Sequence, residues 1–453
     1  MKKDVNKEPI IVTCKDLSSE GKGVVFYNEM VGFIDNLLPL EEASIKITYQ
    51  KKDIFYGEVI TLLKESPYRV KPICPLFSTC GGCQLMHMGY EYQLKYKQNK
   101  VKECLSRIGN IKVEVEDVIG MDDPYHYRNK IQVPIKRVKG QIVSGFYKEK
   151  SHDIVPISHC YIENKEADHI LNTIRILMKK YRIEPYNEDK RTGVIRHILI
   201  RNSHINNKVM VVLVTNVDVF PGRNDFVKEL KKMEPNISTV IQNMNFRDTN
   251  VILGEKERIL SGKGFVEDEL CKVKFKISPK SFFQVNPIQT EKLYLKAIEL
   301  ASLSKDDLIL DAYCGIGTIG LIAAKEVKQV IGVEIVKEAI LDAIKNAKEN
   351  NIENALFYEG DAGEFIKEKY KEGILFDVVF MDPPRKGSDE KFLDILKKTH
   401  PKKIVYISCN PSTLARDLKY LSSDYEVKRV IPFDMFPNTE HVETVVLLTR
   451  IKK

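Results

Sequence analysis

Short apolar runs recur through the last third of the chain, separated by longer amphipathic stretches. Four of them, at 308–310, 330–333, 356–358 and 378–380, are each followed within two residues by an acidic side chain. Continuous apolar runs of this length are typical of strands buried on both faces, and their alternation with helical patterns predicts a parallel sheet. Residues 276–453 are therefore predicted to form one α/β domain.

The front of the chain carries a different pattern. Between residues 8 and 65, short apolar runs are broken by glycine and proline, which predicts a small all-β barrel within residues 1–66. Residues 84–110 show helical periodicity, whereas residues 111–275 show the alternation of strands. A second, β-rich domain is thus predicted to cover residues 67–275.

Composition limits the class of protein. A length of 453 residues with 43% hydrophobic residues fits two or three domains with their own cores. No apolar run approaches the roughly 20 residues of a membrane span, and Met1 leads into no apolar signal core. We therefore expect a cytoplasmic protein without membrane contact. In that compartment, the nine cysteines are better explained as ligands, a nucleophile and core residues than as disulfides.

The net charge of +8 is unevenly distributed. Basic and acidic residues balance within 276–453, so the whole excess lies in residues 1–275. Basic residues there stand near Tyr125, Tyr127 and Phe146, a combination that favours RNA through phosphate contacts and base stacking. A solvated sheet face explains each single residue as well. The basic candidates include Arg128, Lys130, Arg196, His197 and Arg201.

Cys409 follows a strongly apolar run, 404–407, and is flanked by serine, asparagine and proline. The pattern predicts a buried strand that delivers one thiol to a turn at its carboxyl end, where open α/β sheets keep their chemistry. Asp382 closes the preceding strand, and Glu443 opens the last one. An inert core cysteine is the alternative. A thiol and two carboxylates, all at strand ends, favour covalent catalysis.

Three cysteines, Cys74, Cys80 and Cys83, have the spacing C-x₅-C-x₂-C with two glycines between the last pair. Such a tight loop can direct its sulfurs at one centre, and Cys160 is the best candidate for a fourth ligand. Iron–sulfur clusters and structural zinc both take four thiolates, so the spacing leaves the metal open. The cysteines expected in the core are Cys14, Cys104 and Cys271.

A strand that runs into Gly315-x-Gly317 and a helix is followed, about 20 residues later, by Glu334 at the end of the next strand. Glycines let the backbone approach a nucleoside, and the acid can accept both ribose hydroxyls. The third glycine of dinucleotide-binding loops is missing in register, which favours S-adenosylmethionine. Asp361 and Asp382 end the next two strands and are further candidates for contact with this cofactor.

Five motifs together now indicate a family. The chain resembles the bacterial RNA uracil-5-methyltransferases, which make 5-methyluridine in 23S ribosomal RNA and transfer RNA. The resemblance implies three domains: an OB-like TRAM barrel that binds RNA, a central iron–sulfur domain and a class I methyltransferase domain. The helix within 84–110 is then expected to pack on the last domain. The motifs are SFFQVN (281–286), DAYCGIGTIG (311–320), DPPRKG (382–387), YISCNP (406–411) and FPNTEHVE (436–443).

The resemblance also implies roles for residues. It makes Cys74, Cys80, Cys83 and Cys160 ligands of a [4Fe–4S] cluster, and it places Gln284, Tyr313, Glu334 and Asp382 against S-adenosylmethionine. The transfer-RNA branch generally lacks the barrel and the cysteines, which favours 23S ribosomal RNA as the substrate of a monomeric enzyme. The alternatives are the same chemistry on transfer RNA and, less favoured, a non-catalytic RNA-binding protein.

Uracil chemistry explains the residue types independently. Carbon 5 becomes nucleophilic only after a thiolate adds to carbon 6, and Cys409 supplies that thiolate. The sulfonium of the cofactor and the nearby helix start are expected to lower the pKa of Cys409. A carboxylate, Glu443, then removes the carbon 5 proton. Since the target base must leave its stack, Phe282 or Phe283 is expected to pack against it.

Overall fold

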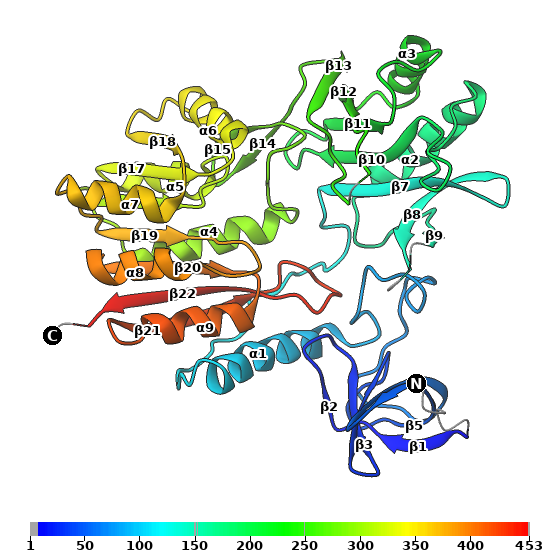
Figure 1. Cartoon of the computed structure of the whole chain (residues 1–453), viewed down its shortest axis with the longest axis horizontal. Helices are drawn as coiled ribbons and strands as arrows, with labels where there is room; N and C mark the ends of the chain where they lie inside the picture. The colour runs from blue at the N-terminus through cyan, green and yellow to red at the C-terminus, as the bar shows by residue number, and fades with distance from the viewer. Residues whose placement is uncertain (1–7, 149–150, 152, 249, 452–453) are drawn as a thin grey trace.

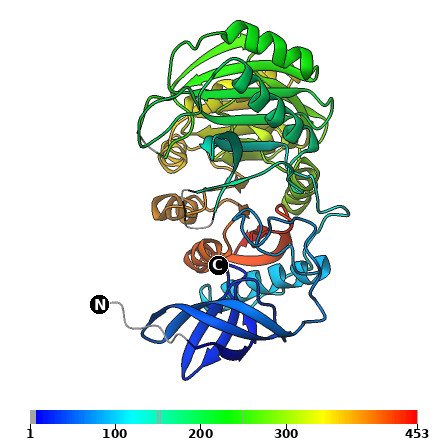
Figure 2. The same cartoon turned by 90° about the vertical axis from the view of Figure 1, so that its right-hand side faces the viewer.

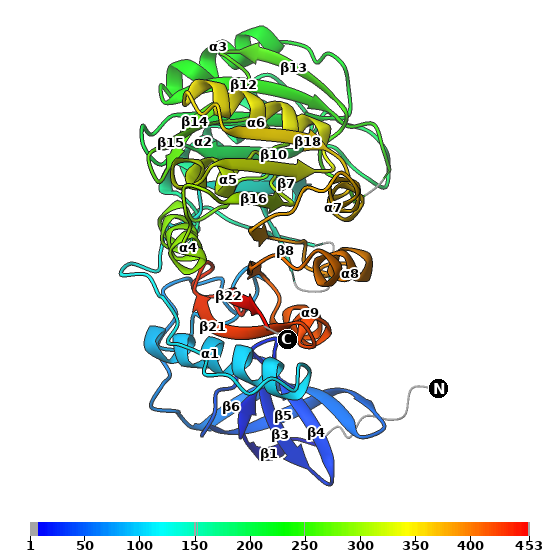
Figure 3. The same cartoon turned by 90° about the vertical axis from the view of Figure 1, so that its left-hand side faces the viewer.

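The computed structural model describes residues 8–148, 151, 153–248 and 250–451 of the chain. In this part the strands form three large sheets and one two-stranded hairpin. Figures 1 and 3 show the N-terminal sheet at one end of the molecule and the central sheet at the other, and in Figure 1 the C-terminal sheet lies on the left, beside the central sheet. No helix within the described ranges is long and apolar enough to cross a membrane.

The N-terminal sheet has the order β1-β5-β6-β4-β3-β2. Its strands are half-buried, with apolar residues such as Val25, Ile45 and Phe55 on the inner face. The all-β expectation for this part is therefore met, while its assignment as a TRAM barrel stays a prediction. The strands are β1 (Ile10–Thr13), β2 (Asp16–Leu17), β3 (Gly23–Tyr27), β4 (Met30–Ile34), β5 (Glu42–Lys51) and β6 (Ile54–Lys64).

The central sheet has the order β13-β12-β11-β10-β7-β8-β9, and only β11 and β12 pair in parallel. Helices α2 (Lys165–Lys180) and α3 (Arg223–Met233) share a core with this sheet. The strands are β7 (Lys130–Val138), β8 (Gln141–Tyr147), β9 (Ile154–Pro156), β10 (Ile195–Asn202), β11 (Val209–Thr215), β12 (Ile237–Met244) and β13 (Lys256–Ser261).

Strands β10 and β11 are buried on both faces. Ile198 and Ile200 pack with the central helices, whereas Leu199 belongs to the core of the C-terminal domain. We expected basic residues of this sheet to contact RNA. This expectation is wrong for the basic candidates on β10, because these residues are at most 8% exposed. These buried residues are Arg196, His197 and Arg201.

The C-terminal sheet has the order β18-β17-β16-β19-β20-β22-β21, and β22 alone runs antiparallel to both of its neighbours. This confirms the class I methyltransferase fold. A hairpin, β14 (Val266–Leu270) and β15 (Val273–Ile277), precedes it. The sheet strands are β16 (Leu308–Ala312), β17 (Gln329–Glu334), β18 (Ala355–Glu359), β19 (Val378–Met381), β20 (Lys403–Ser408), β21 (Tyr425–Phe433) and β22 (Glu443–Arg450).

Helices cover the C-terminal sheet. Residues of α4 share a core with one set of strand residues, and residues of α8 and α9 share a core with another. The helices are α4 (Pro287–Ala301), α5 (Thr318–Ala323), α6 (Lys337–Glu349), α7 (Ala362–Lys371), α8 (Glu390–Thr399) and α9 (Pro411–Leu421), and a 3₁₀ turn, Ala324–Glu326, follows α5.

Helix α1 (Tyr90–Arg107) precedes the central sheet in the chain but packs against the C-terminal domain (Figures 1 and 2). Its Val101 and Leu105 join the core formed by α8 and α9. Lys97 and Asp434 are both fully buried and form an ion pair with an N–O distance of 2.5 Å. Because an unpaired charge is costly in such a place, this pair fixes the helix to the loop before β22.

Candidate active site

Sheet register brings Asp382, Cys409 and Glu443 to one edge. Met381, the last residue of β19, pairs with Tyr406, and Ser408, the last residue of β20, pairs with Thr444. Since β22 is antiparallel, its first residue lies beside the carboxyl end of β20. The thiol and both carboxylates therefore meet at neighbouring strand ends, as predicted.

Burial and mutual repulsion control the protonation of these three groups. Burial, then the charges of Glu443 and Asp382, raises the pKa of Cys409 to about 12. Burial and the charge of Asp382 raise the pKa of Glu443 to about 8, and burial raises the pKa of Asp382 to about 7. Two neighbouring carboxylates do not ionise independently, so Glu443 and Asp382 are not both fully ionised at neutral pH.

The expected lowering of the Cys409 pKa by the helix start is not found. Helix α9 begins with Pro411, which has no N–H, and the Asn410 side chain accepts the N–H of Ser412 at 3.1 Å. Two donors of the first turn are therefore missing or already used. A cation next to the sulfur can offset part of the effect of burial.

Arg385 is that cation within the chain. Its positive charge lowers the pKa of both Cys409 and Glu443. Its carbonyl accepts a hydrogen bond from the Asn410 side chain at 3.1 Å, and its guanidinium lies 3.3 Å from Nε2 of His441. From the sequence, Arg385 is noted only as part of the DPPRKG motif, without a role of its own. Its link to His441 spans 56 positions, which no local pattern reveals.

We predict that Arg385→Gln slows alkylation of Cys409 by iodoacetamide at pH 8. Loss of the cation raises the thiol pKa, so less thiolate exists at a given pH, and the rate should fall about two- to tenfold. Peptide mass spectrometry separates Cys409 from the other cysteines. Arg429→Gln, which removes an exposed arginine paired with Glu116, is the control and should leave the rate unchanged. Equal rates for Arg385→Gln and the wild type would contradict the role.

The loop after β16 is shaped for close approach of a ligand. Tyr313, Gly315 and Gly317 all have positive φ, of 63°, 56° and 79°. A Cβ at Gly315 would meet no atom within 4 Å, so this face of the backbone is open, whereas one at Gly317 would lie 2.8 Å from the ring of Phe357. Glu334 accepts the N–H of Gly315 at 3.2 Å and thereby holds the open loop.

The remaining cofactor candidates differ in their surroundings. The buried phenol of Tyr294 hydrogen-bonds the Gln284 side chain and feels the charge of Asp382, which links these two candidates. Asp361 caps α7 by accepting the N–H of Glu364 at 3.0 Å, an ordinary structural role. Sequence reasoning missed Asp311, whose pKa burial raises to about 7 and which accepts the N–H of Gly320 at 2.8 Å.

The two neighbouring phenylalanines are not equivalent. Phe282 is 65% exposed and free to stack on a base, whereas Phe283 is 2% exposed and packs against Phe275 with ring centroids 5.9 Å apart. Phe283 is therefore excluded as the stacking partner.

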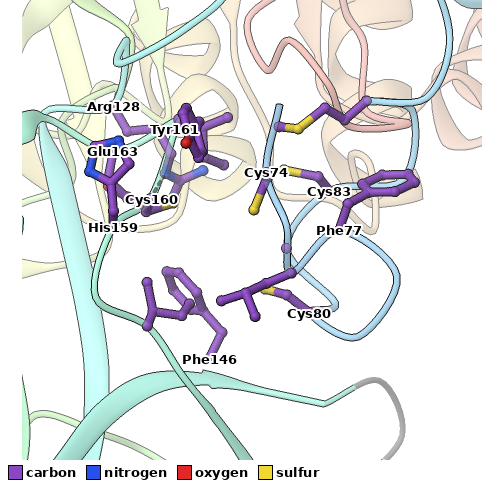
Figure 4. Close-up of a pocket in the computed structure, with 15 residues that line it drawn as sticks. Cys74, Phe77, Cys80, Cys83, Arg128, Phe146, His159, Cys160, Tyr161 and Glu163 are labelled. Atoms are coloured by element: carbon purple, nitrogen blue, oxygen red, sulfur yellow. Dashed lines mark ion pairs between the residues drawn. The ribbon is translucent and has the colours of Figure 1, made fainter. Parts of the chain in front are cut away.

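The four candidate cysteine ligands line one cavity of about 180 Å³ (Figure 4). Cys74, Cys80 and Cys83 lie on one loop, and Cys160 faces them from the segment between β9 and α2. Burial, then the charges of the other three cysteines, raises the pKa of Cys83. Across the described residues, no group of three or more His, Cys, Asp or Glu is arranged to hold a metal ion. The thiols thus surround a cavity instead of converging on one ion.

The other cysteines match the core expectation only in part. Cys14 is 1% exposed, and burial raises its pKa to about 12. Cys104 and Cys271 are half-buried, and Cys271 stands at a hairpin turn with φ of 50°. Neither lies in the interior of a core.

Comparison with known proteins now assigns the chain. Residues 89–451 match the model of the tRNA (uracil-5-)-methyltransferase family. The chain belongs to this family. It is therefore an RNA methyltransferase that uses S-adenosylmethionine. The match begins at α1 and does not include the N-terminal sheet.

Relatives in other bacteria extend over the whole chain. An uncharacterized RNA methyltransferase of Listeria innocua is 44% identical over 443 residues, 98% of each chain. One of Bacillus cereus is 43% identical over 448 residues, 98% of this chain and 97% of the other. These names support the reaction class and leave the RNA target open.

One solved structure bears directly on the target. The tRNA (uracil-54, C5)-methyltransferase of Pyrococcus abyssi, in complex with S-adenosyl-L-homocysteine, is 29% identical, with a TM-score of 0.78 over 97% of this chain and 100% of its own. A match of that extent includes the N-terminal sheet. A transfer-RNA enzyme can therefore share it, and its presence does not distinguish ribosomal from transfer RNA.

Proposed function

We propose that this enzyme methylates carbon 5 of a uridine in 23S ribosomal RNA through a covalent bond between Cys409 and carbon 6. The observation that carries the proposed chemistry is the meeting of Cys409, Glu443 and Asp382 at one edge of the sheet, which also holds the open loop at Gly315. Methylation of an amine needs no nucleophilic thiol, so a thiol beside a buried carboxylate favours methylation of carbon. The choice of RNA rests on the family resemblance.

The residues act in sequence. The Cys409 thiolate adds to carbon 6, and the π electrons of the ring shift to make carbon 5 nucleophilic. When bound, S-adenosylmethionine supplies a positive charge near the thiol and the methyl group, which bonds to carbon 5 as its bond to the sulfonium sulfur breaks. The Glu443 carboxylate then accepts the carbon 5 proton; the electrons of that C–H bond form the C5=C6 double bond, and the bond between carbon 6 and sulfur breaks. Arg385 favours the anionic forms of both groups.

The carboxylates and the loop after β16 form the cofactor site. We propose that Gln284, Tyr313, Glu334 and Asp382 contact S-adenosylmethionine, with the N-terminal sheet acting as a TRAM barrel on the RNA. The exposed ring of Phe282 is the proposed stacking partner of the target base.

Transfer RNA is the second candidate substrate, because the similar Pyrococcus abyssi enzyme is named for it. Mass-spectrometric mapping of 5-methyluridine in both RNAs from a deletion strain distinguishes the two. Loss of the modification from 23S ribosomal RNA alone supports the proposal. Loss from transfer RNA alone would make transfer RNA the target and leave the proposed chemistry unchanged.

The covalent step has its own test. RNA that contains 5-fluorouracil should form a stable adduct with the enzyme, since fluorine cannot leave carbon 5 as a proton does. The complex should survive denaturing electrophoresis and require Cys409. Absence of any adduct with a folded, cofactor-loaded enzyme would count against covalent catalysis.

We also propose that Cys74, Cys80, Cys83 and Cys160 hold a [4Fe–4S] cluster. Four thiols around one cavity match the donor set of a cubane. A bound cluster would cross-link the loop 74–83 to the segment after β9.

For the cluster, we predict that protein purified without oxygen is brown, with a broad absorption at roughly 400 nm, as expected for iron–thiolate charge transfer. Cys160→Ser should lower both the iron content and this absorption. Cys104→Ser, a change of a half-buried cysteine outside the cavity, should keep them. Colourless protein with one bound zinc would refute the cluster.

A further inference from the structure

The loop between β21 and β22 carries the proposed base at its end. This base loop, residues 434–442, is followed directly by Glu443. In the described structure, its main polar contacts come from residues 84–127, which precede the central sheet. The segment that aims the base is therefore held by a part of the chain more than 300 positions away.

Asn438 is the centre of these contacts. It is 2% exposed and has φ of 67°, a conformation that asparagine tolerates better than most residues. Its carbonyl accepts the N–H groups of Gln84 at 3.1 Å and Leu85 at 2.9 Å, and Gln84 directly follows Cys83. The backbone of Asn438 is thus bonded to the end of the cysteine loop, residues 74–83.

Asn438 also forms hydrogen bonds through its backbone N–H and through its side chain. The backbone N–H of Asn438 donates to Oε1 of Gln93 at 3.0 Å, and the Gln93 amide donates back to Oδ1 of the Asn438 side chain at 3.3 Å. Nδ2 of Asn438 donates to the carbonyl of Pro124 at 3.0 Å. Gln93 is itself 2% exposed, so water does not compete for these bonds.

The residues beside Asn438 are bound in the same way. The Tyr127 hydroxyl donates to the carbonyl of Pro437 at 3.0 Å, and Tyr127 packs in the small core that contains Cys74, Cys83 and Cys160. From α1, Lys97 donates to the carbonyl of Phe436 at 3.1 Å, and Lys100 to that of Glu440 at 2.7 Å.

We propose that Asn438 is a positioning residue for the base, through which the cysteine loop and α1 hold Glu443 against the reacting uracil. The inference rests on the proposed function. Asn438 does not touch the reacting atoms; it acts through the base loop. Since proton removal needs the base within hydrogen-bond reach, a small displacement should slow elimination more than the earlier thiol addition.

The test uses Asn438→Gly in the full-length enzyme. Glycine keeps the backbone at φ of 67° without strain and removes only the side-chain bonds. With radiolabelled substrate RNA, denaturing electrophoresis should show about two- to tenfold more covalent RNA–protein complex at steady state, and kcat should fall by a similar factor. The KM for S-adenosylmethionine should not change.

Two tyrosine variants make a matched pair in case the glycine variant folds poorly. Tyr127→Phe removes a buried hydroxyl that bonds the base loop, and should also increase the complex. Tyr425→Phe removes a buried hydroxyl that bonds the carbonyls of Leu396 and Pro401, away from that loop, and should not. Thermal unfolding of each variant shows whether the fold is kept.

Each outcome has a definite meaning. An increase in Asn438→Gly and Tyr127→Phe but not in Tyr425→Phe supports the positioning role. Wild-type levels of complex in folded Asn438→Gly and Tyr127→Phe, or an equal increase in Tyr425→Phe, would overturn it. Glu443→Gln serves as the reference: if it accumulates complex and the loop variants do not, the positioning role fails while the base assignment stands.

Discussion

Cys409→Ala is expected to lower the rate of methylation by about 10⁴-fold or more, because Cys409 is the thiol that lies beside Glu443 and Asp382 and is proposed to add to carbon 6. Binding of S-adenosylmethionine should persist, since the thiol acts on the base and not on the cofactor. Isothermal titration calorimetry and a radiolabelled methyl-transfer assay measure the two effects separately.

The control for this variant is Cys104→Ala, which removes a half-buried thiol at the contact of α1 with α9. It should retain activity, so a loss specific to Cys409 cannot be attributed to any missing thiol. Appreciable turnover by Cys409→Ala would end the covalent mechanism, whatever RNA is the substrate.

The chemistry of the strand ends was predictable because it follows from topology. The carboxyl ends of parallel strands lie at one edge of a sheet, so Asp382 and Cys409 were expected at the same edge once their apolar runs were recognised as strands. The position of Glu443 was harder to predict. This residue opens its strand and reaches the same edge only because β22 is antiparallel. The local pattern predicted that Glu443 opens the last strand, whereas the direction of that strand is known from the structure.

The sequence did not reveal which side chains are buried by contacts between distant segments. Arg201 alternates with apolar residues as a solvated strand residue would, yet β10 is covered on both faces and the side chain is 1% exposed. In the same way, Phe282 and Phe283 are identical in type, and only their packing distinguishes the exposed ring from the buried one. Neither difference has a local signal.

Partners far apart in the chain also decide how the site works. The pKa of Cys409 was expected to be lowered by the sulfonium of the cofactor and by a nearby helix start, but within the chain burial and two carboxylates raise it. The helix offers little, since Pro411 has no N–H and Asn410 already caps the turn. Asn438 is a further case, because its bonds to residues 84–124 depend on contacts that no motif encodes.

Glu443→Gln should separate methyl transfer from release of the product. The amide keeps the size of the side chain but cannot accept the carbon 5 proton. Addition of Cys409 and methyl transfer should proceed, and the enzyme should remain bonded to methylated uracil. Denaturing electrophoresis with labelled cofactor should show a long-lived RNA–protein species, with kcat reduced by about 10²- to 10⁴-fold.

The pH dependence of elimination provides an independent reading of the same residue. Burial raises the pKa of Glu443 to about 8, so below that pH the group holds its proton and cannot take another. In the wild type, the breakdown of the covalent species should therefore slow as the pH falls below about 8 and become insensitive to pH above it. This dependence of the breakdown rate on pH should be absent in Glu443→Gln.

A structural carboxylate predicts a different result. If Glu443 only supported the start of β22, its replacement would lower stability or activity without accumulating a labelled covalent species. The double variant Cys409→Ala with Glu443→Gln must form no such species, which shows that the bond is to Cys409. Free, unmethylated RNA beside folded Glu443→Gln enzyme would overturn the assignment of Glu443 as the base. Free, methylated RNA formed at the wild-type rate would assign the base to another residue, and Asp382, whose pKa burial raises to about 7 at the same edge, would be the next to test.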